Sequence, residues 1–326
     1  MSKKKRIISK IVLILLISIF LSLLIPTSYM VMAPGIAQEL STLITVEDAY
    51  QNQGEFLLTA VSSKRAKLWE YLYINLLKPV GFELDTLPEG LSMGKYIEIM
   101  NLSMDDSKNT AKAVAFMAAG YEVNIRNNGA LVNDVLIGGS AEGKLEPGDL
   151  IIAIDRKEIL EVQDAIDLIR NHSIGEEVII TVKRNYEELE FTMKTISLED
   201  EPDQSSIGVR IYTNREYVFP REVRFETQNI AGASAGGMFT LEIYNQLQEE
   251  DITKGKRIAG TGTIDLDGTI GEIDGVEQKV LAAEREKAEV FFVPVENYEA
   301  ARKIASKIKL VAIENIDDAI QYLKQN

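Results

Sequence analysis

Cysteine is absent from this 326-residue chain, and histidine occurs only once, as His172. Without cysteine the protein has no disulfides, no thiolate metal ligands and no cysteine nucleophile. A single histidine also excludes a zinc site of the two-histidine H-E-x-x-H type. A Ser-His-Asp triad would have to use His172, which we interpret instead as a surface residue near the end of a helix. Few hydrolase mechanisms remain open.

Positive charge is scarce as well. The chain has 35 Lys and Arg against 50 Asp and Glu, and its formal net charge is −15. Binding to nucleic-acid phosphates needs a basic face, so we expect no nucleic-acid partner. We also expect no metal and no other cofactor.

A basic cluster at residues 3–6 precedes an apolar run from Ile11 to Ile25, which Pro26 ends. A helix that crosses a bilayer needs about 20 apolar residues, and basic flanks stay on the cytoplasmic side. The pattern predicts an uncleaved single-pass anchor in the cell membrane, with the catalytic part extracytoplasmic. A signal peptide cleaved near Ala33 is the alternative.

Periodicity and turn residues indicate α+β structure after the anchor. Asp267-Gly268 predicts a hairpin between strands within residues 258–270. The acidic segment 198–205 has few apolar residues and is interpreted as a linker. Further expected elements are a strand at 54–61 and helices at 107–119, 161–171 and 275–287.

The middle of the chain, residues 116–197, has glycine turns that include Gly138-Gly139 and Gly148-Asp149. This pattern resembles a PDZ domain. In that family a peptide adds as a strand at a sheet edge beside a helix, and loop amides hold its carboxylate. A β-rich spacer that binds nothing is the alternative. The resemblance assigns peptide binding to Gly120, Tyr121, Glu122, Val123 and Val162, although Glu122 stands where the family usually has glycine.

A run of small residues from Gly232 to Gly237 opens an expected helix. Its amides, at Ser234 and Ala235, are suited to stabilising an oxyanion, and Gly232 lets a substrate backbone approach. From these residues alone, Ser234 is either a nucleophile or a helix N-cap. The segment fits the G-x-S-x-G elbow, which needs a later histidine as base, and none follows. A catalytic Ser234 therefore needs another base.

Lys279 is the candidate base. It lies near the start of a helix, flanked by Val276, Val280 and Ala283. Burial and the positive helix end would both lower its pKa, so that a neutral amine could accept a serine proton. A nearby Asp274 would act in the opposite direction. A solvated surface lysine stays open on the pattern alone.

Residues 205–326 resemble the proteolytic domain of Lon-family Ser-Lys proteases. Ser234 matches the nucleophile of the family's Gly-Pro-Ser-Ala-Gly motif, and Lys279 matches the dyad lysine. Thr261 matches the threonine that supports this lysine, and Asn297 ends a matching Pro-x-Glu-Asn segment. Ala233 replaces the motif's proline, but both dyad members are present.

The predicted fold class is α+β, with an N-terminal transmembrane helix, a small juxtamembrane region, a PDZ-like domain and a Lon-type proteolytic domain. The expected bounds are 1–33, 34–115, 116–197 and 205–326.

This order resembles the secreted PDZ-Lon proteases of Gram-positive bacteria. The resemblance implies an ATP-independent serine endopeptidase that cleaves peptides or exposed protein segments outside the cytoplasmic membrane, aided by the PDZ domain. A PDZ adaptor without catalysis is the alternative from another class. Assembly into a homo-oligomer is left open.

Overall fold

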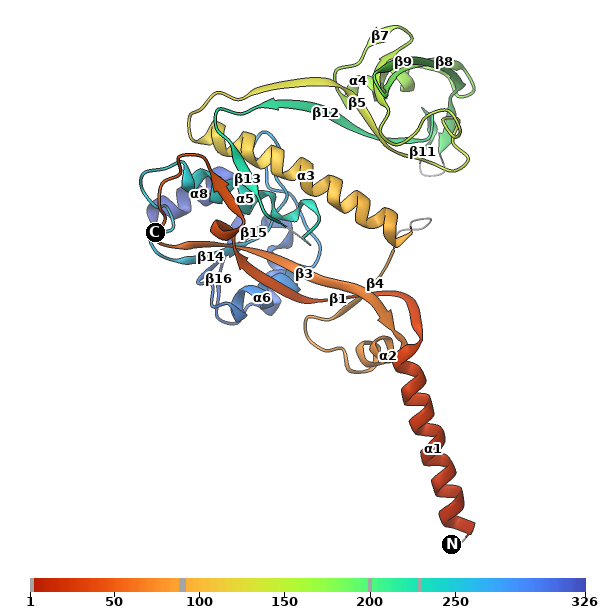
Figure 1. Ribbon diagram of the computed structural model, residues 1–326, viewed down its shortest axis with the longest axis vertical. Helices are drawn as coiled ribbons and strands as arrows, with labels where there is room; N and C mark the ends of the chain where they lie inside the picture. Colours follow the sequence, from red (N-terminus) through yellow and green to blue (C-terminus); the bar gives the residue numbers. More distant parts are fainter. Residues whose placement is uncertain (1–2, 88–91, 199–200, 228–229) are drawn as a thin grey trace. The chain divides into compact units, whose positions relative to one another are not determined.

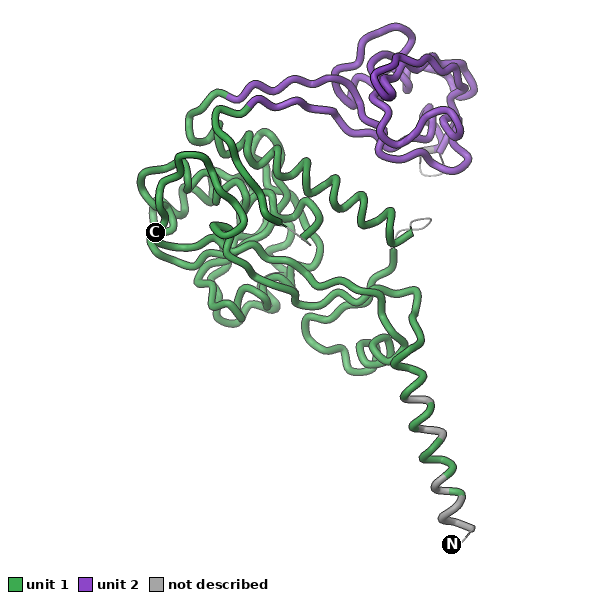
Figure 2. The backbone as a smooth tube through the Cα atoms, in the orientation of Figure 1, with its two compact units in different colours: residues 1–122, 219–326 green, residues 123–218 purple. Residues whose placement is uncertain are grey.

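The computed structural model describes residues 3–87, 92–198, 201–227 and 230–326. The chain divides into two compact units. Unit 1 combines residues 1–122 with 219–326, and unit 2 is the contiguous segment 123–218 (Figure 2).

Unit 1 is built on a six-stranded sheet in the order β16-β15-β14-β3-β1-β4. The strand β14 runs parallel to β3 and β15, β15 runs parallel to β16, and β1 is antiparallel to β3 and β4. Every residue of β15 is buried, as expected for a central parallel strand covered on both faces. The bounds are β1 Pro26–Glu39, β3 Glu55–Lys67, β4 Glu83–Thr86, β14 Arg257–Gly260, β15 Val290–Pro294 and β16 Lys309–Ile313.

Helices cover both faces of this sheet. Figure 1 shows α3 and α5 on one side and α6 on the other. A short pair of strands, β2 and β13, joins the two chain segments once more. The bounds are α2 Leu68–Leu77, α3 Met93–Ala118, α5 Gly236–Gln246, α6 Val276–Arg285, α7 Tyr298–Ile304, α8 Ile316–Gln325, β2 Ile44–Val46 and β13 Val223–Phe225.

The predicted fold class is wrong in containing a separate juxtamembrane region. Residues 34–115 supply the second part of β1, all of β3 and β4, and most of α3. Because β14 pairs with β3 along residues 55–58, the N-terminal strands complete the sheet that the C-terminal strands begin. Unit 1 is therefore formed by two segments that unit 2 separates in the sequence.

The predicted transmembrane helix is wrong too. In the described part of the chain, none of the helices combines the length and apolar character needed to cross a bilayer. The first helix, α1 (Lys3–Leu24), includes five basic residues up to Lys10. The remaining stretch Ile11–Leu24 is roughly 21 Å long, against a hydrocarbon core of about 30 Å. The prediction of a single-pass membrane protein is contradicted by this finding.

Two smaller predictions also fail. The expected hairpin around Asp267-Gly268 is a turn without flanking strands, because β14 instead pairs in parallel with strands distant in sequence. The expected linker 198–205 contributes to the pair β10 (Ile196–Leu198) and β11 (Glu201–Ser206).

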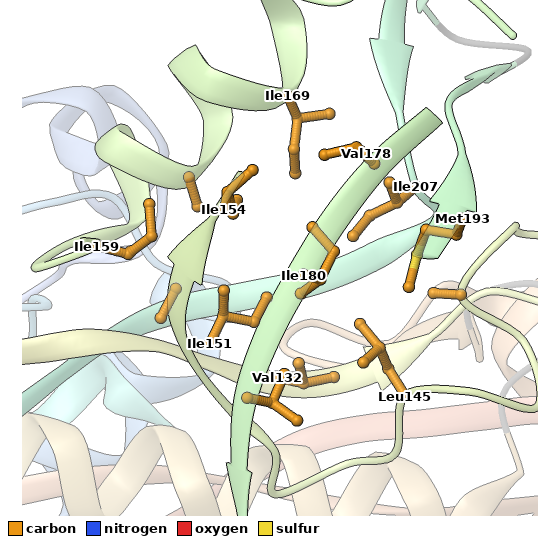
Figure 3. Packing of buried hydrophobic residues seen from close by; sticks show 14 residues of the cluster. Val132, Leu145, Ile151, Ile154, Ile159, Ile169, Val178, Ile180, Met193 and Ile207 are labelled. Atoms are coloured by element: carbon orange, nitrogen blue, oxygen red, sulfur yellow. The ribbon is translucent and has the colours of Figure 1, made fainter. Parts of the chain in front are cut away.

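Unit 2 is a sheet in the order β12-β5-β6-β8-β9, with β7 paired to β6. Alternating residues of these strands and the apolar face of α4 form its core, which includes Ile151, Ile180 and Ile169 (Figure 3). The first and last strands of the unit, β5 and β12, pair with each other. The bounds are β5 Asn124–Val135, β6 Leu150–Ile154, β7 Lys157–Glu158, α4 Val162–Arg170, β8 Glu177–Arg184, β9 Glu187–Lys194 and β12 Val209–Val218.

Candidate active site

The loop that carries Ser234 is a short 3₁₀ turn, η2 (Ala233–Ala235), which leads directly into α5. Gly232 precedes it with φ of 98°, in the left-handed region that favours glycine. The N-cap positions belong to Gly232 and Ala235, and neither makes a side-chain capping bond. Ser234 is half-buried within the turn, so the alternative of an N-cap serine does not describe this loop.

The segment after β14 fixes the Ser234 main chain. The Ser234 carbonyl oxygen accepts hydrogen bonds from the Thr261 hydroxyl at 3.0 Å and from the Gly262 N–H at 2.8 Å. The Gly237 N–H in turn donates to the Gly262 carbonyl at 3.1 Å. Because β14 is a central strand of the sheet, it gives this loop a rigid support.

Lys279 is buried, with 3% of its surface exposed, so the alternative of a solvated surface lysine is wrong. Its Nζ donates a hydrogen bond to Thr261 Oγ1 at 3.2 Å. Burial lowers the pKa of Lys279 to about 8, and the charge of Asp274 acts in the opposite direction. A lysine with this pKa has a substantial neutral fraction near pH 8, as a general base requires. Thr261 therefore contacts both Lys279 and the Ser234 main chain.

The loop before α6 is held by Asn297. The buried Asn297 side chain accepts from the Ile273 N–H at 2.9 Å and donates to the Ile273 carbonyl at 3.0 Å. Asp274 and Gly275 follow, and Gly275 is the N-cap of α6 with φ of 70°. The sequence motif included Asn297, but it did not indicate this contact.

Unit 2 offers a candidate for a peptide-binding edge. The strand β12 pairs with β5 along one edge, and within the described residues no strand pairs along its other edge. The helix α4 lies beside β12, where the Val162 N–H donates to Thr213 Oγ1 at 3.1 Å. An edge strand beside a helix is the arrangement to which PDZ domains add a peptide.

The structure places the other predicted peptide-binding residues elsewhere. The Gly120 and Tyr121 N–H groups bond to the Met117 and Phe116 carbonyls, so they end α3, and Glu122 is exposed beyond them. Val123 begins unit 2, before β5.

The loop that leads into β12 is not among the predicted peptide-binding residues, although it lies at one end of the candidate edge. It contains Ile207 and Gly208, and Gly208 has φ of 77°. An apolar residue followed by glycine at the start of a strand is the signal that would have found it.

Among the described residues, no group of three acidic or histidine side chains gathers to hold a metal ion.

Two protein families match parts of this chain. Residues 103–195 match the PDZ domain, and residues 228–325 match the Lon protease (S16) C-terminal proteolytic domain. The chain contains a PDZ domain and a Lon-type proteolytic domain. It is a serine peptidase, a hydrolase. No curated protein matches the chain.

Solved structures are similar to about a quarter of the chain. The PDZ domain of an SdrC-like protein from Listeria monocytogenes is 26% identical, with a TM-score of 0.25, covering 26% of this chain and 87% of that one. Its counterpart from Listeria innocua is 28% identical, with a TM-score of 0.24 and coverage of 26% and 92%. A solution structure from Geobacillus thermodenitrificans is 30% identical, with a TM-score of 0.24 and coverage of 26% and 95%.

Proposed function

We propose that the enzyme is an ATP-independent endopeptidase with Ser234 as nucleophile and Lys279 as general base. The observation that carries the proposal is the buried Lys279 amine, whose pKa is lowered to about 8 and whose hydrogen-bond partner, Thr261, also binds the Ser234 main chain. A buried lysine and a serine on a glycine-rich turn, linked through one threonine hydroxyl, are the groups that acyl transfer requires.

The reaction follows from these positions. The neutral Lys279 amine takes the proton of the Ser234 hydroxyl as its oxygen attacks the peptide carbonyl carbon. The N–H groups of Ser234 and Ala235 stabilise the oxyanion, and the Thr261 hydroxyl keeps the amine oriented. The protonated lysine then gives its proton to the leaving amine, and water hydrolyses the acyl-enzyme with Lys279 again as base.

The substrates we propose are peptides and unfolded protein segments. No step above uses nucleotide hydrolysis, so we expect substrates that need no prior unfolding. The free edge of β12 beside α4 would hold one end of an extended peptide through main-chain hydrogen bonds. Recognition would then belong to unit 2 and cleavage to unit 1.

The test compares hydrolysis of an unfolded protein by the wild type, Ser234→Ala and Lys279→Met, without ATP and with a chelator present. Methionine fills much of the lysine volume without an amine. Each variant should lose at least about 10³-fold in kcat, because dyad members act as a unit. Lys303→Ala removes an exposed lysine and should leave the rate unchanged. Full activity of Lys279→Met would overturn the base assignment, and an inactive wild type would overturn the function.

A further inference from the structure

A helix outside the Lon-type match holds the main chain just before Ser234. The Gly232 N–H donates to the Met100 carbonyl of α3 at 2.9 Å, and the Ser107 hydroxyl of α3 donates to the Ala233 carbonyl at 3.1 Å. Ser107 is 4% exposed. A serine inside a helix usually faces solvent or bonds its own helix. Here its hydroxyl instead crosses to the nucleophile loop, 126 residues away in sequence.

The contact acts on a peptide unit that matters for catalysis. The Ala233 carbonyl and the Ser234 N–H belong to one planar peptide group, so holding the oxygen fixes the direction of the N–H. The Gly236 N–H also donates to this oxygen. The next peptide group is fixed through the Ser234 carbonyl by Thr261 and Gly262. Both peptide groups that flank the Ser234 side chain are therefore held, one by α3 and one by the segment after β14.

The close approach of α3 depends on Gly236. A Cβ atom at this position would lie 2.7 Å from Ser107 Oγ and 2.4 Å from Ile264 Cγ2. Neither distance is tolerated in a packed interior, so the glycine makes room for the Ser107 hydroxyl at the loop.

We propose that Ser107 is a positioning residue, which directs the Ser234 N–H toward the oxyanion through the peptide group between Ala233 and Ser234. This inference rests on the proposed function. Loss of an entire oxyanion donor costs about 10²–10³-fold in kcat. Because the Gly236 N–H still holds the Ala233 carbonyl, we expect a smaller loss of about tenfold for Ser107→Ala. Substrate binding, and hence KM, should stay unchanged.

The experiment uses the full chain with Ser107→Ala, Ser107→Cys and the control Ser103→Ala, which removes a hydroxyl one turn earlier on α3. We would measure kcat and KM for a fluorogenic peptide and the inhibition constant of an aldehyde of the same peptide. The aldehyde forms a hemiacetal: Ser234 Oγ bonds to its carbon, and the carbonyl oxygen becomes the oxyanion as Lys279 takes the serine proton. The Ser107→Ala variant should lose about tenfold in kcat and in aldehyde affinity at constant KM. The Ser107→Cys variant, of similar size but with a weaker donor, should fall between it and the wild type.

Thermal unfolding of each variant separates this role from a structural one. A loss of kcat that follows the folded fraction, or an equal loss in Ser103→Ala, would overturn the positioning role. Unchanged kcat and aldehyde affinity in a folded Ser107→Cys would overturn it as well, even where Ser107→Ala does not fold. If the wild type is active and Ser234→Ala inactivates it, the proposed function stands even where the inference about Ser107 is overturned. An inactive wild type would overturn both the proposed function and the positioning role of Ser107.

Discussion

The two units of the molecule are assembled in opposite ways. Unit 2 is one contiguous segment, and its strands pair with partners less than about 100 residues away within it. Unit 1 joins two segments, and β14 pairs in parallel with β3 about 200 residues earlier. Such distant pairing brings groups from separate segments to one place, at the expense of loop-closure entropy. The candidate catalytic groups lie in unit 1 and the candidate recognition edge in unit 2.

This division predicts separable effects on kinetics. Changes at the contacts around Ser234 and Lys279 should lower kcat, because in the proposed mechanism they act on groups that stabilise the transition state. Changes at the β12 edge should raise KM for long substrates and leave kcat alone. The three predictions below probe the comparison, from the largest expected effect to the smallest.

The largest effect is expected at Thr261, which contacts both sides of the candidate dyad. The Thr261→Val substitution keeps the shape but removes the hydroxyl that accepts from Lys279 and donates to the Ser234 carbonyl. We expect kcat/KM to fall about 100-fold, equivalent to ~2.7 kcal/mol of barrier. Steady-state kinetics with an unfolded substrate would measure it.

Thr59→Val is the matched control, because the buried Thr59 hydroxyl donates to the Gly260 carbonyl at 2.8 Å, next to Thr261. Both variants should lose about 1 kcal/mol of unfolding free energy. Only Thr261→Val should show the fall in kcat/KM. Equal rates in the two variants would show that Thr261 supports the fold and not the reaction.

The pH dependence gives a second, smaller effect within unit 1. In the proposed mechanism the neutral form of Lys279 acts as base, so kcat/KM should rise as the pH increases through about 8 and then level off. Asp274 raises the pKa of Lys279, so Asp274→Asn should lower that pKa and move the rising limb to lower pH. The variant should therefore be faster than wild type near pH 7 and equal to it on the plateau.

A pH series of kcat/KM at low salt would measure this shift. High salt should reduce it, because Asp274 is exposed and its charge is screened. The exposed carboxylate of Asp267, in the turn before α6, provides the control Asp267→Asn, which should leave the limb in place. A limb that does not move in Asp274→Asn would show that another group sets the pH dependence.

Much of the candidate site in unit 1 could be predicted from sequence. The residues Ser234, Thr261 and Lys279 stand in short motifs, each on the segment that positions it, and local patterns predicted the helices α5 and α6. The sequence patterns could not predict which residues distant in sequence are in contact. Helical periodicity predicted part of α3, but it did not show that Ser107 faces the nucleophile loop.

The remaining failures have physical causes of the same kind. A strand pattern at residues 54–61 predicts β3 but not its partner, because pairing depends on which edge another segment offers. In the same way, the PDZ resemblance assigned peptide binding to Gly120, whereas Gly208 lies beyond the expected bounds of that domain, 116–197. Only the pairing of β12 with β5 shows that Gly208 leads into the strand with a free edge.

The smallest expected effect is at the recognition edge of unit 2. Val162 is half-buried at the start of α4, beside β12, and packs against the core of the unit. We expect Val162→Ala to raise KM for a long peptide a few-fold, about 0.5–1 kcal/mol, by removing apolar contact area at the edge. The value of kcat, and the KM of a peptide too short to reach unit 2, should not change. Val135→Ala removes the same methyl groups from β5 against the same core. If it raised KM equally, loss of packing and not peptide contact would explain the effect, and the assignment of recognition to this edge would fail.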